Sequence, residues 1–366
     1  MKLLILGTVP DELLNLKVDL IKTILKKNYK VIASSSSINP NTKIGIENSN
    51  FTYDAIYLKR HGYSLIGNIR TLASLFNLYR KHKPDYILAS GIKLVIWGGI
   101  AAKVRRTFFC AHITGLGYAF QGKSISRKFL TTFVSFLYKV ALKNAKAVIF
   151  ENKDNRDLFV NKGIICKSKS FVINGSGVNL KKYSFTKIPE TPINFLVIAR
   201  LLSEKGIREY AAAAKIVKEK FPDIKFNLVG AQDESLDAIP LEEVLSWSDY
   251  INYHGYIFNI EEVIKSCHVF VLPSYHEGLP RCTLEAMSTG RPILTTNAVG
   301  CRETVSEGYN GFMVPVGSSK KLASKMIWFI ENQEKIKIMG QNSRILAEKK
   351  FDIHEVNKEI LNIIGI

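Results

Sequence analysis

Two glutamates, Glu277 and Glu285, lie eight residues apart in SYHEGLPRCTLEAMSTGRP, residues 274–292. Paired carboxylates are the groups that glycoside hydrolases use as acid and base, and such a pair flanks one bond at ~5–9.5 Å. The spacing here predicts a different use, because the first glutamate falls in a turn and the second inside the helix that follows. Two acids strung along a loop and a helix are suited to accept hydrogen bonds from separate hydroxyl groups of one extended ligand.

The neighbouring residues define that turn and that helix. Gly278 permits backbone angles that other residues avoid, and Pro280 suits the first turn of a helix, which Gly290 ends. The backbone N–H groups around Gly278 and Leu279 can donate to the same ligand. Glu285 has a simpler interpretation as an early helical glutamate favoured by the helix dipole. Its apolar neighbours weigh against this, because a half-buried acid requires a partner.

A second cluster of charge lies in FLVIARLLSEKGIREYAAAAKI, a buried strand followed by a loop and an alanine-rich helix. Arg200 stands at the end of the strand and Lys205 stands in the loop. A guanidinium fork and an ammonium group beside a helix N-terminus can bind a diphosphate, although both residues also suit a plain surface loop. The chain contains no GxxxxGK(S/T) loop, and GTVPDE near Gly7 does not match GxGxxG.

These clusters need strands and helices to hold them, and the chain supplies both in alternation. Apolar runs such as KLLILG and DYILAS in the first half, and FLVIAR and HVFVLPS in the second, alternate with helical patterns. The alternation predicts βαβ units and a parallel sheet in each half. Ligands bind beyond the carboxyl ends of the strands in such sheets, so two domains facing each other would share one cleft.

Length and composition agree with two domains. A chain of 366 residues suits two cores of about 150–200 residues each. The polar, proline-containing segment KIPETPIN is the candidate linker, which predicts one domain over 1–186, a second over 187–350 and a helix over 351–366. The five cysteines are scattered without a CxxC pair, which indicates neither a disulfide framework nor a zinc site and fits a reducing cytoplasm. The longest apolar runs fall short of the ~20 residues that span a membrane.

Charge is distributed unevenly between the two halves. Residues 1–189 contain 31 Lys/Arg and 9 Asp/Glu, a net charge of +22, whereas residues 190–366 contain 20 and 23, a net of −3. No acid occurs between Tyr86 and Phe150. A basic half indicates an anionic partner, although a solubilising surface would also be basic. Within this stretch, SISRKFLTTFVSFLYKVALKNAK mixes Phe and Leu with Arg and Lys, so its phenylalanines either face a membrane interface or fill the core.

The motifs together resemble a known family. The segment PSYHEGLPRCTLEAMSTGRPILTTNAVGCRETVSEGYNGFMVPVG is similar to the C-terminal signature of the family 4 glycosyltransferases, which are retaining enzymes of the GT-B fold. ARLLSEKGI resembles the phosphate-binding segment of that family, and VINGSGVNLKKY its interdomain element. ITGLGYAF is similar to a segment of the branch that extends lipid-carrier-linked glycans and surface polysaccharides. The resemblance implies two Rossmann-like domains facing across a cleft, with the C-terminal helix returning to the first domain.

The resemblance also implies a role for each candidate residue. Arg200 and Lys205 would bind the diphosphate of a nucleotide-sugar, and Glu285 would bind the hydroxyls of its ribose. Glu277 would bind the hydroxyls of the transferred sugar, together with the backbone at Gly278 and Leu279. His112, just before ITGLG, matches a histidine that family members place near the donor sugar.

The activity implied is transfer of a hexose or N-acetylhexosamine, with retention, from a UDP-sugar to a polyprenyl-diphosphate-linked saccharide. No metal and no other cofactor are expected, because two fixed cations stand at the diphosphate. The enzyme is expected to be peripheral on the cytoplasmic face of the inner membrane, with its basic half against anionic lipid. Two alternatives stay open at this point: a nucleic-acid-binding protein that uses the basic half, and a sugar-nucleotide epimerase of the same fold.

Overall fold

The computed structural model describes most of the chain, namely residues 1–10, 13, 17–36, 50–59, 65–117, 120, 125–190, 192–235 and 237–366. Four parts of the segments discussed above fall outside this description. They are residues 11–12 and 14–16 after the first strand, residues 118–119 of ITGLGYAF, residues 121–124 ahead of the aromatic and basic helix, and residue 191 of KIPETPIN.

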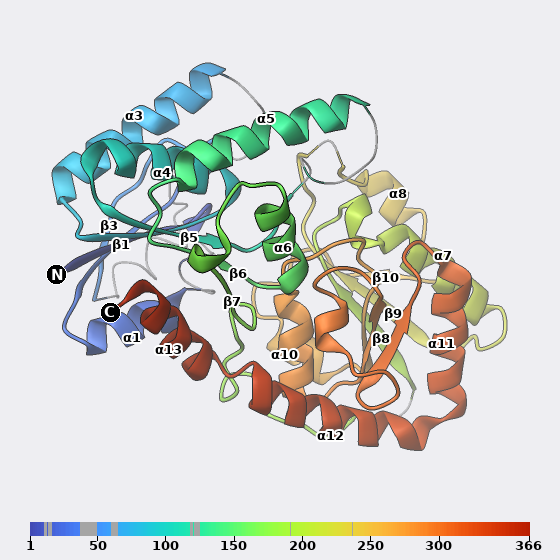
Figure 1. Cartoon of the computed structure of the whole chain (residues 1–366). Coiled ribbons are helices and arrows are strands. Elements are labelled where there is room, and N and C mark those ends of the chain that lie inside the picture. The colour runs from blue at the N-terminus through green and yellow to red at the C-terminus, as the bar shows by residue number, and fades with distance from the viewer. Residues whose placement is uncertain are drawn as a thin grey trace. The chain divides into compact units, whose positions relative to one another are not determined.

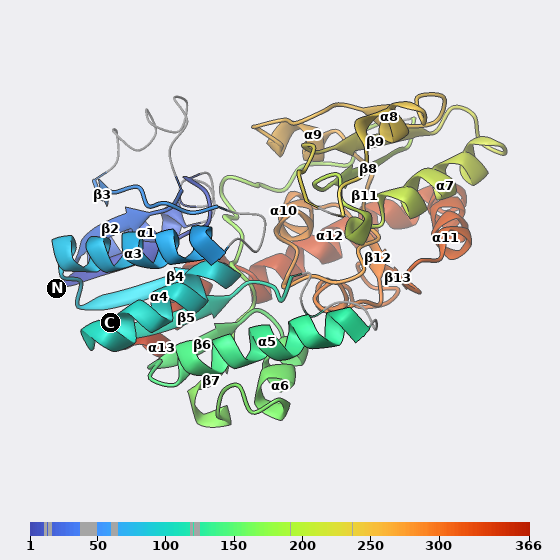
Figure 2. The same ribbon diagram turned by 90° about the horizontal axis from the view of Figure 1, so that it is seen from above.

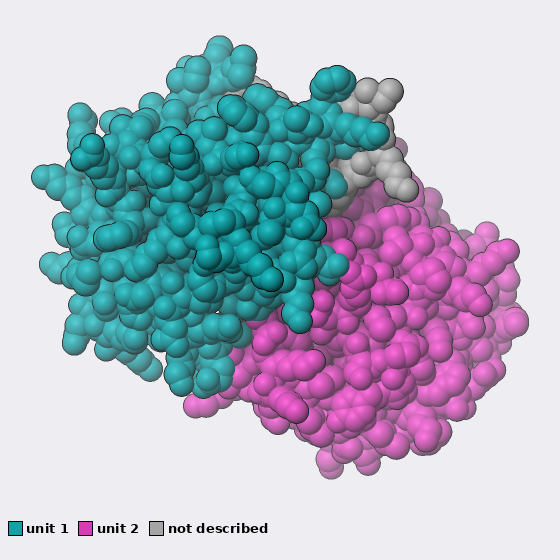
Figure 3. All heavy atoms as spheres, in the orientation of Figure 1, with its two compact units in different colours: residues 1–173, 354–366 teal, residues 174–353 magenta. Residues whose placement is uncertain are grey.

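The chain forms two compact units (Figure 3). Unit 1 comprises Met1–Ile173 and His354–Ile366, and unit 2 comprises Asn174–Ile353. The proline-containing segment 187–194 therefore lies within unit 2. Residues ahead of it already belong to the packing of that unit, since Val178 forms a parallel bridge with Asp352 and Tyr183 is buried in one of its cores.

Unit 1 is built on a seven-stranded sheet in the order β3-β2-β1-β4-β5-β6-β7, and every neighbouring pair is parallel (Figure 1). Alternate residues of Lys2–Leu6, strand β1, face opposite sides of the sheet, as strand geometry requires. The strands are β1 Lys2–Leu6, β2 Lys30–Ser34, β3 Thr52–Tyr53, β4 Tyr86–Ser90, β5 Phe108–Ile113, β6 Ala147–Phe150 and β7 Ser170–Val172.

Helices cover both faces of this sheet. Leu4 and Leu6 of β1 belong to the core under α3 (Leu65–His82), α4 (Ile92–Arg105) and α5 (Ile125–Leu142), which lie side by side in Figures 1 and 2. Leu3 and Ile5 belong to the opposite core, with α1 (Val18–Lys26) and α13 (Ile353–Ile364). The predicted return of the C-terminal helix is confirmed, because α13 completes a core of unit 1. The remaining helical elements are α6 Lys153–Asn161 and η3 Lys167–Lys169.

Unit 2 repeats the architecture with six parallel strands in the order β10-β9-β8-β11-β12-β13. Two apolar cores cover the two faces of the sheet. The strands are β8 Asn194–Ile198, β9 Lys225–Val229, β10 Asn252–Tyr253, β11 Val269–Leu272, β12 Ile293–Thr296 and β13 Gly311–Val314. The helical elements are η4 Ser203–Lys205, α7 Ile207–Lys218, α8 Leu241–Leu245, α9 Glu261–Lys265, α10 Arg281–Thr289, η5 Arg302–Thr304, α11 Ser319–Glu331 and α12 Gln333–Lys350.

Strand order reverses once in each sheet. In unit 1 the reversal lies between β1 and β4, and in unit 2 it lies between β8 and β11. Doubly wound sheets bind ligands at this point, beyond the carboxyl ends of the two strands. Within the ranges that the structure describes, no helix is both long and apolar enough to span a bilayer.

Candidate functional site

The reversal point of unit 2 joins the two charged segments that the sequence singles out. Arg200 follows β8 by two residues, and Lys205 ends the short helix η4. Glu277 follows the neighbouring strand β11, and Glu285 lies in α10. Since β8 and β11 are adjacent and parallel, their carboxyl ends bring the cations and the carboxylates to one edge of the sheet.

Close backbone contacts hold the two segments against each other. The amide N–H of Tyr275 donates to the carbonyl oxygen of Glu204 at 2.8 Å, and the Ser274 hydroxyl oxygen lies 3.1 Å from the same oxygen. Gly206 has a φ of +69°, and a Cβ there would lie 2.1 Å from the carbonyl oxygen of Pro273. Only glycine fits this approach, so the loop after β8 can pack directly on the end of β11.

Lys205 and Glu277 form the central ion pair of the site. The Nζ atom of Lys205 lies 2.7 Å from Oε1 of Glu277, and the Ser274 hydroxyl donates to that oxygen at 2.8 Å. Burial alone would lower the pKa of the Lys205 ammonium, but the charge of Glu277 and its hydrogen bond outweigh burial and raise this pKa above its usual value. Lys205 is therefore fully charged at neutral pH and its position is fixed by a carboxylate.

Arg200 is paired with Asp233, a residue for which the sequence alone suggests no role. The Nη1 atom of Arg200 donates to Oδ2 of Asp233 at 2.5 Å, and Asp233 lies in the loop that follows β9. Burial would raise the pKa of Asp233, but hydrogen bonds to Ser235 and the Arg200 charge lower it below its usual value. The aspartate thus orients the guanidinium. No local pattern could have revealed this pair, because 33 residues separate its members.

Glu285 is a buried acid with partners, as its apolar neighbours predict. Only 5 % of this residue is exposed, and Nε of Arg281 donates to its Oε1 at 3.0 Å. Burial raises the pKa of Glu285, while the Arg281 charge and hydrogen bonds from Arg281 and Tyr183 oppose that rise. The i,i+4 spacing of Arg281 and Glu285 on one helix was the signal available in the sequence.

The loop that precedes α10 is shaped by its neighbours as well. The amide of Glu277 donates to the carbonyl oxygen of Val299 at 2.9 Å. Gly300 lies against this loop, and a Cβ at that position would come within 2.3 Å of the carbonyl oxygen of Gly278. Leu279 is buried in the core of unit 2. Helix α10 begins at Arg281 and ends at Thr289, and Gly290, with a φ of +86°, terminates it as the sequence predicts.

His112 lies in unit 1, near the carboxyl end of β5. It is buried, with Nδ1 at 3.0 Å from Nζ of Lys17 and Nε2 at 3.3 Å from Oε1 of Glu151. A charged lysine can only donate, so Nδ1 accepts and the ring proton lies on Nε2, toward Glu151. Nothing in the sequence pointed to either partner, because both are distant from His112 along the chain. A role of His112 at the donor sugar stays a prediction.

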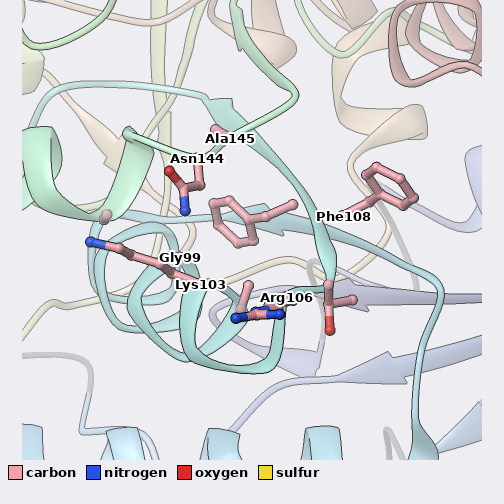
Figure 4. Close-up of a pocket in the computed structure, with 10 residues that line it drawn as sticks. Gly99, Lys103, Arg106, Phe108, Asn144 and Ala145 are labelled. Carbon is pink, nitrogen blue, oxygen red and sulfur yellow. The ribbon is translucent and has the colours of Figure 1, made fainter.

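A pocket of about 220 Å³ lies elsewhere in unit 1, between the C-terminal ends of α4 and α5 and the first residues of β5 (Figure 4). Lys103, Arg106 and Asn144 are among its lining residues. It lies at the amino ends of the strands, the edge opposite to that of the reversal point, and contains none of the candidate residues. Among the described residues, no group of three or more His, Cys, Asp or Glu side chains could hold a metal ion.

Two family models and several curated proteins match this chain. A family model described as "Glycosyl transferases group 1" matches residues 181–345, and one described as "Glycosyl transferase 4-like" matches residues 2–152. The N,N'-diacetylbacillosaminyl-diphospho-undecaprenol alpha-1,3-N-acetylgalactosaminyltransferase of Campylobacter jejuni is 32% identical over 68% of this chain and 69% of its own length.

The chain belongs to the family 4 glycosyltransferases. A second relative, the UDP-Gal:alpha-D-GlcNAc-diphosphoundecaprenol alpha-1,3-galactosyltransferase of Escherichia coli, is 26% identical over 79% of this glycosyltransferase and 77% of its own length. The comparisons give no support to a nucleic-acid-binding protein or an epimerase.

Solved structures confirm the GT-B fold of this glycosyltransferase. Anabaena Alr3699/HepE in complex with UDP-glucose superposes with a TM-score of 0.81 at 19% identity, covering 100% of this chain and 99% of that one. Sucrose-phosphate synthase from Thermosynechococcus elongatus gives a TM-score of 0.80 at 17% identity, covering 99% and 98%. At such low identities the likeness establishes the fold alone.

Proposed function

We propose that this glycosyltransferase moves a hexose or an N-acetylhexosamine from a UDP-sugar to a polyprenyl-diphosphate-linked saccharide, in the assembly of a surface polysaccharide or a glycoprotein glycan. The observation that supports it most is the grouping of two cations and two carboxylates at the β8–β11 reversal point, in a member of this family. The names of the two relatives, which act on diphospho-undecaprenol-linked sugars, support the acceptor class.

In this proposal the donor extends along the edge of the unit 2 sheet. Arg200 and Lys205 bind the diphosphate. An ammonium group has three N–H donors, so Lys205 can donate to phosphate oxygens while Glu277 holds it at 2.7 Å. Glu285 accepts from the ribose hydroxyls, and Glu277 accepts from the sugar hydroxyls, with backbone donors at Gly278 and Leu279.

The proposed chemistry is dissociation of the bond between the anomeric carbon and the diphosphate. Negative charge accumulates on the departing phosphate, and cations fixed beforehand at that position stabilise the transition state more than the ground state. Arg200 and Lys205 would thereby take the part that a divalent metal takes in other transferases. The acceptor hydroxyl attacks the face that the phosphate leaves, and the phosphate oxygen takes its proton.

Retention of configuration has its own support. The Escherichia coli relative is named as using UDP-Gal and forming an alpha-1,3 linkage. UDP-galactose carries its sugar in the α configuration, so an α product from that donor means retention. We extend the same stereochemical course to this chain, and we place its reaction at the cytoplasmic face of the inner membrane, where the enzyme would be peripheral.

The test combines binding and turnover. The melting temperature of the purified chain is measured with UDP, GDP, ADP and their common sugar conjugates, because a ligand that binds only the folded state raises it. We expect a selective rise with uridine nucleotides. Product analysis with a polyprenyl-diphosphate saccharide should then give an α-linked sugar. A flat response across the panel would overturn the donor site, and a changed UDP-sugar formed without an acceptor would indicate an epimerase instead.

A further inference from the structure

Helix α5 of unit 1 presents a row of phenylalanines to solvent. Phe129, Phe133 and Phe136 are 75%, 58% and 61% exposed, and their spacing of four and three residues puts them on one side of the helix. The opposite side packs into the core through Val134 and Tyr138. The sequence left open whether these phenylalanines are core residues, and the structure excludes that for all three.

Helix α3 adds aliphatic residues to the same outer layer. Leu65, Ile66 and Ile69 in its first turns are exposed, while Leu75 and Leu78 face the core. Helices α3 and α5 flank α4 on one face of the sheet (Figures 1 and 2). We name the six exposed apolar residues the α3–α5 surface: Leu65, Ile66, Ile69, Phe129, Phe133 and Phe136.

The charge of this layer is of one sign. Helices α3, α4 and α5 contain nine Lys/Arg and no Asp or Glu: Arg70, Arg80, Lys81, Lys93, Lys103, Arg105, Arg127, Lys128 and Lys139. The helices on the other face of the sheet do contain acids, with Asp19 in α1 and Glu355 and Glu359 in α13. Helix α6 packs on the same core and contains Asp154 and Asp157, so the composition without acids is confined to α3, α4 and α5.

We propose that the α3–α5 surface docks the enzyme on an anionic lipid bilayer, an inference that rests on the proposed lipid-linked acceptor. Outward phenylalanine and isoleucine side chains insert at the boundary between headgroups and acyl chains, and basic residues beside them attract anionic headgroups. Lys128 and Lys139 flank the phenylalanine row and are long enough to lay their stems along it while their ammonium groups reach the headgroups. A nucleic acid fits less well, because Leu65, Ile66 and Ile69 offer no ring on which a base can stack.

The position of this surface also suits the reaction. In a parallel α/β unit, each helix begins at the edge where the preceding strand ends. Five of the six apolar residues lie in the first half of α3 or α5, toward the carboxyl edge of the unit 1 sheet, and Phe136 lies just past the middle of α5. Docking by these residues therefore brings that edge, where such sheets bind ligands, close to the headgroup layer that contains a lipid-linked diphosphate.

The experiment is flotation of the full chain with vesicles, at low salt, using phosphatidylcholine alone and an equal mixture of phosphatidylcholine and phosphatidylglycerol. We expect binding to the anionic vesicles. A triple variant, Phe129→Ser with Phe133→Ser and Phe136→Ser, should bind at least about tenfold more weakly, since most of the inserted apolar area is lost. Because all three side chains are exposed, its melting temperature should stay near that of the wild type.

A matched control separates the surface from apolar residues in general. Leu245, Ile338 and Ile345 are also exposed helical residues, but they belong to unit 2. A triple serine variant of these three should bind vesicles as the wild type does. Equal binding by the phenylalanine variant and the wild type would overturn the proposal, as would an equal loss in the control. Preferential binding to a DNA duplex, unaffected by the phenylalanine changes, would assign the basic layer to nucleic acid instead.

Failure of docking can be told apart from failure of the proposed function. Transfer to a short-chain acceptor analogue in detergent solution does not require a bilayer. If the wild type transfers sugar to this analogue but ignores vesicles, the docking surface is wrong and the function stands. If the wild type binds vesicles but neither UDP nor a UDP-sugar raises its melting temperature, docking stands and the function is wrong.

Discussion

Each cation of the candidate site has a carboxylate partner within the chain. Arg200 pairs with Asp233, Lys205 with Glu277 and Arg281 with Glu285. Each pair already restricts the side-chain freedom of its cation, so less conformational entropy is lost when a ligand binds. A variant that removes one member therefore also leaves a partner without its counter-charge, and controls must allow for this.

The first prediction concerns Arg200, whose side chain is 42% exposed. Arg200→Ala should weaken UDP binding by about tenfold or more, because a charge-assisted bond to phosphate is lost, and it should also lower stability, because Asp233, whose side chain is only 4% exposed, loses its counter-charge. Arg208 is the matched control, since it is 43% exposed and also pairs with an acid, Glu243. Calorimetric titration should find UDP binding kept in Arg208→Ala. Equal losses in both variants would contradict the assignment of Arg200 to the diphosphate.

The second prediction concerns Glu285, whose burial raises its pKa above the usual 4.5. The folded state then holds the proton more tightly than the unfolded state, so this group makes the wild type less stable as pH rises from about 4.5 through its folded pKa. Glu285→Gln lacks this titration. Denaturant unfolding at several pH values should therefore show stability shifting in favour of the variant as pH rises. A difference independent of pH would contradict the raised pKa, and UDP binding should weaken in the variant at neutral pH.

At the scale of elements, the site depends on how closely two loops approach. The loop from β8 to α7 packs on the end of β11, and the strand order of unit 2 makes β8 and β11 neighbours although β9 and β10 lie between them in the sequence. Glycine at the contact is required by both the backbone conformation and the space. Backbone packing thus assembles the proposed donor site.

The third prediction follows from Gly206. Gly206→Ala should lower the free energy of unfolding by about 2 kcal/mol or more, through a left-handed backbone and a Cβ pressed against Pro273. Gly255 has nearly the same φ, +68°, with nothing within 4 Å of an added Cβ. Gly255→Ala should show the backbone cost alone. Only the change at Gly206 is expected to weaken UDP binding, which denaturant unfolding and titration together can test.

At the scale of the whole molecule, the chain connects the two units twice: it enters unit 2 after Ile173 and returns to unit 1 after Ile353. Helix α13 follows unit 2 in the chain but packs into the core of unit 1 through Val356, Ile360, Leu361 and Ile364. During synthesis, all of unit 2 is therefore made before the last helix of unit 1. Unit 1 is expected to be stable only when residues 354–366 are in place.

The fourth prediction tests this return. Ile360→Asp introduces a carboxylate into a core position and should destabilise unit 1 by about 3 kcal/mol or more, while unit 2 keeps its stability. Lys358→Asp places the same residue at an exposed position of α13 and serves as the control. Hydrogen exchange resolved by mass spectrometry reports each unit separately. Faster exchange in unit 2 alone, or in the Lys358 variant, would be inconsistent with this packing.

The sequence by itself determined the secondary structure and the short motifs of this protein. The period of its apolar residues located strands and helices, Gly290 ended α10 as expected, and the two charged motifs and the basic first half were visible as patterns. These features depend on neighbours a few residues apart, whose geometry is set by helix and strand periods. The family, and with it the fold, followed from motifs of the same short range.

Only the tertiary structure decided which of these residues meet. Asp233 lies 33 residues from Arg200, and Glu277 lies 72 residues from Lys205, so their pairing depends on strand order rather than on spacing. The same is true of the phenylalanines of α5: composition showed an aromatic and basic helix, but which side faces the core depends on α4 and the sheet beneath. Long-range contacts have no local signature because they are selected by the packing of whole elements, and that packing brought the cations and carboxylates together at one edge of a sheet.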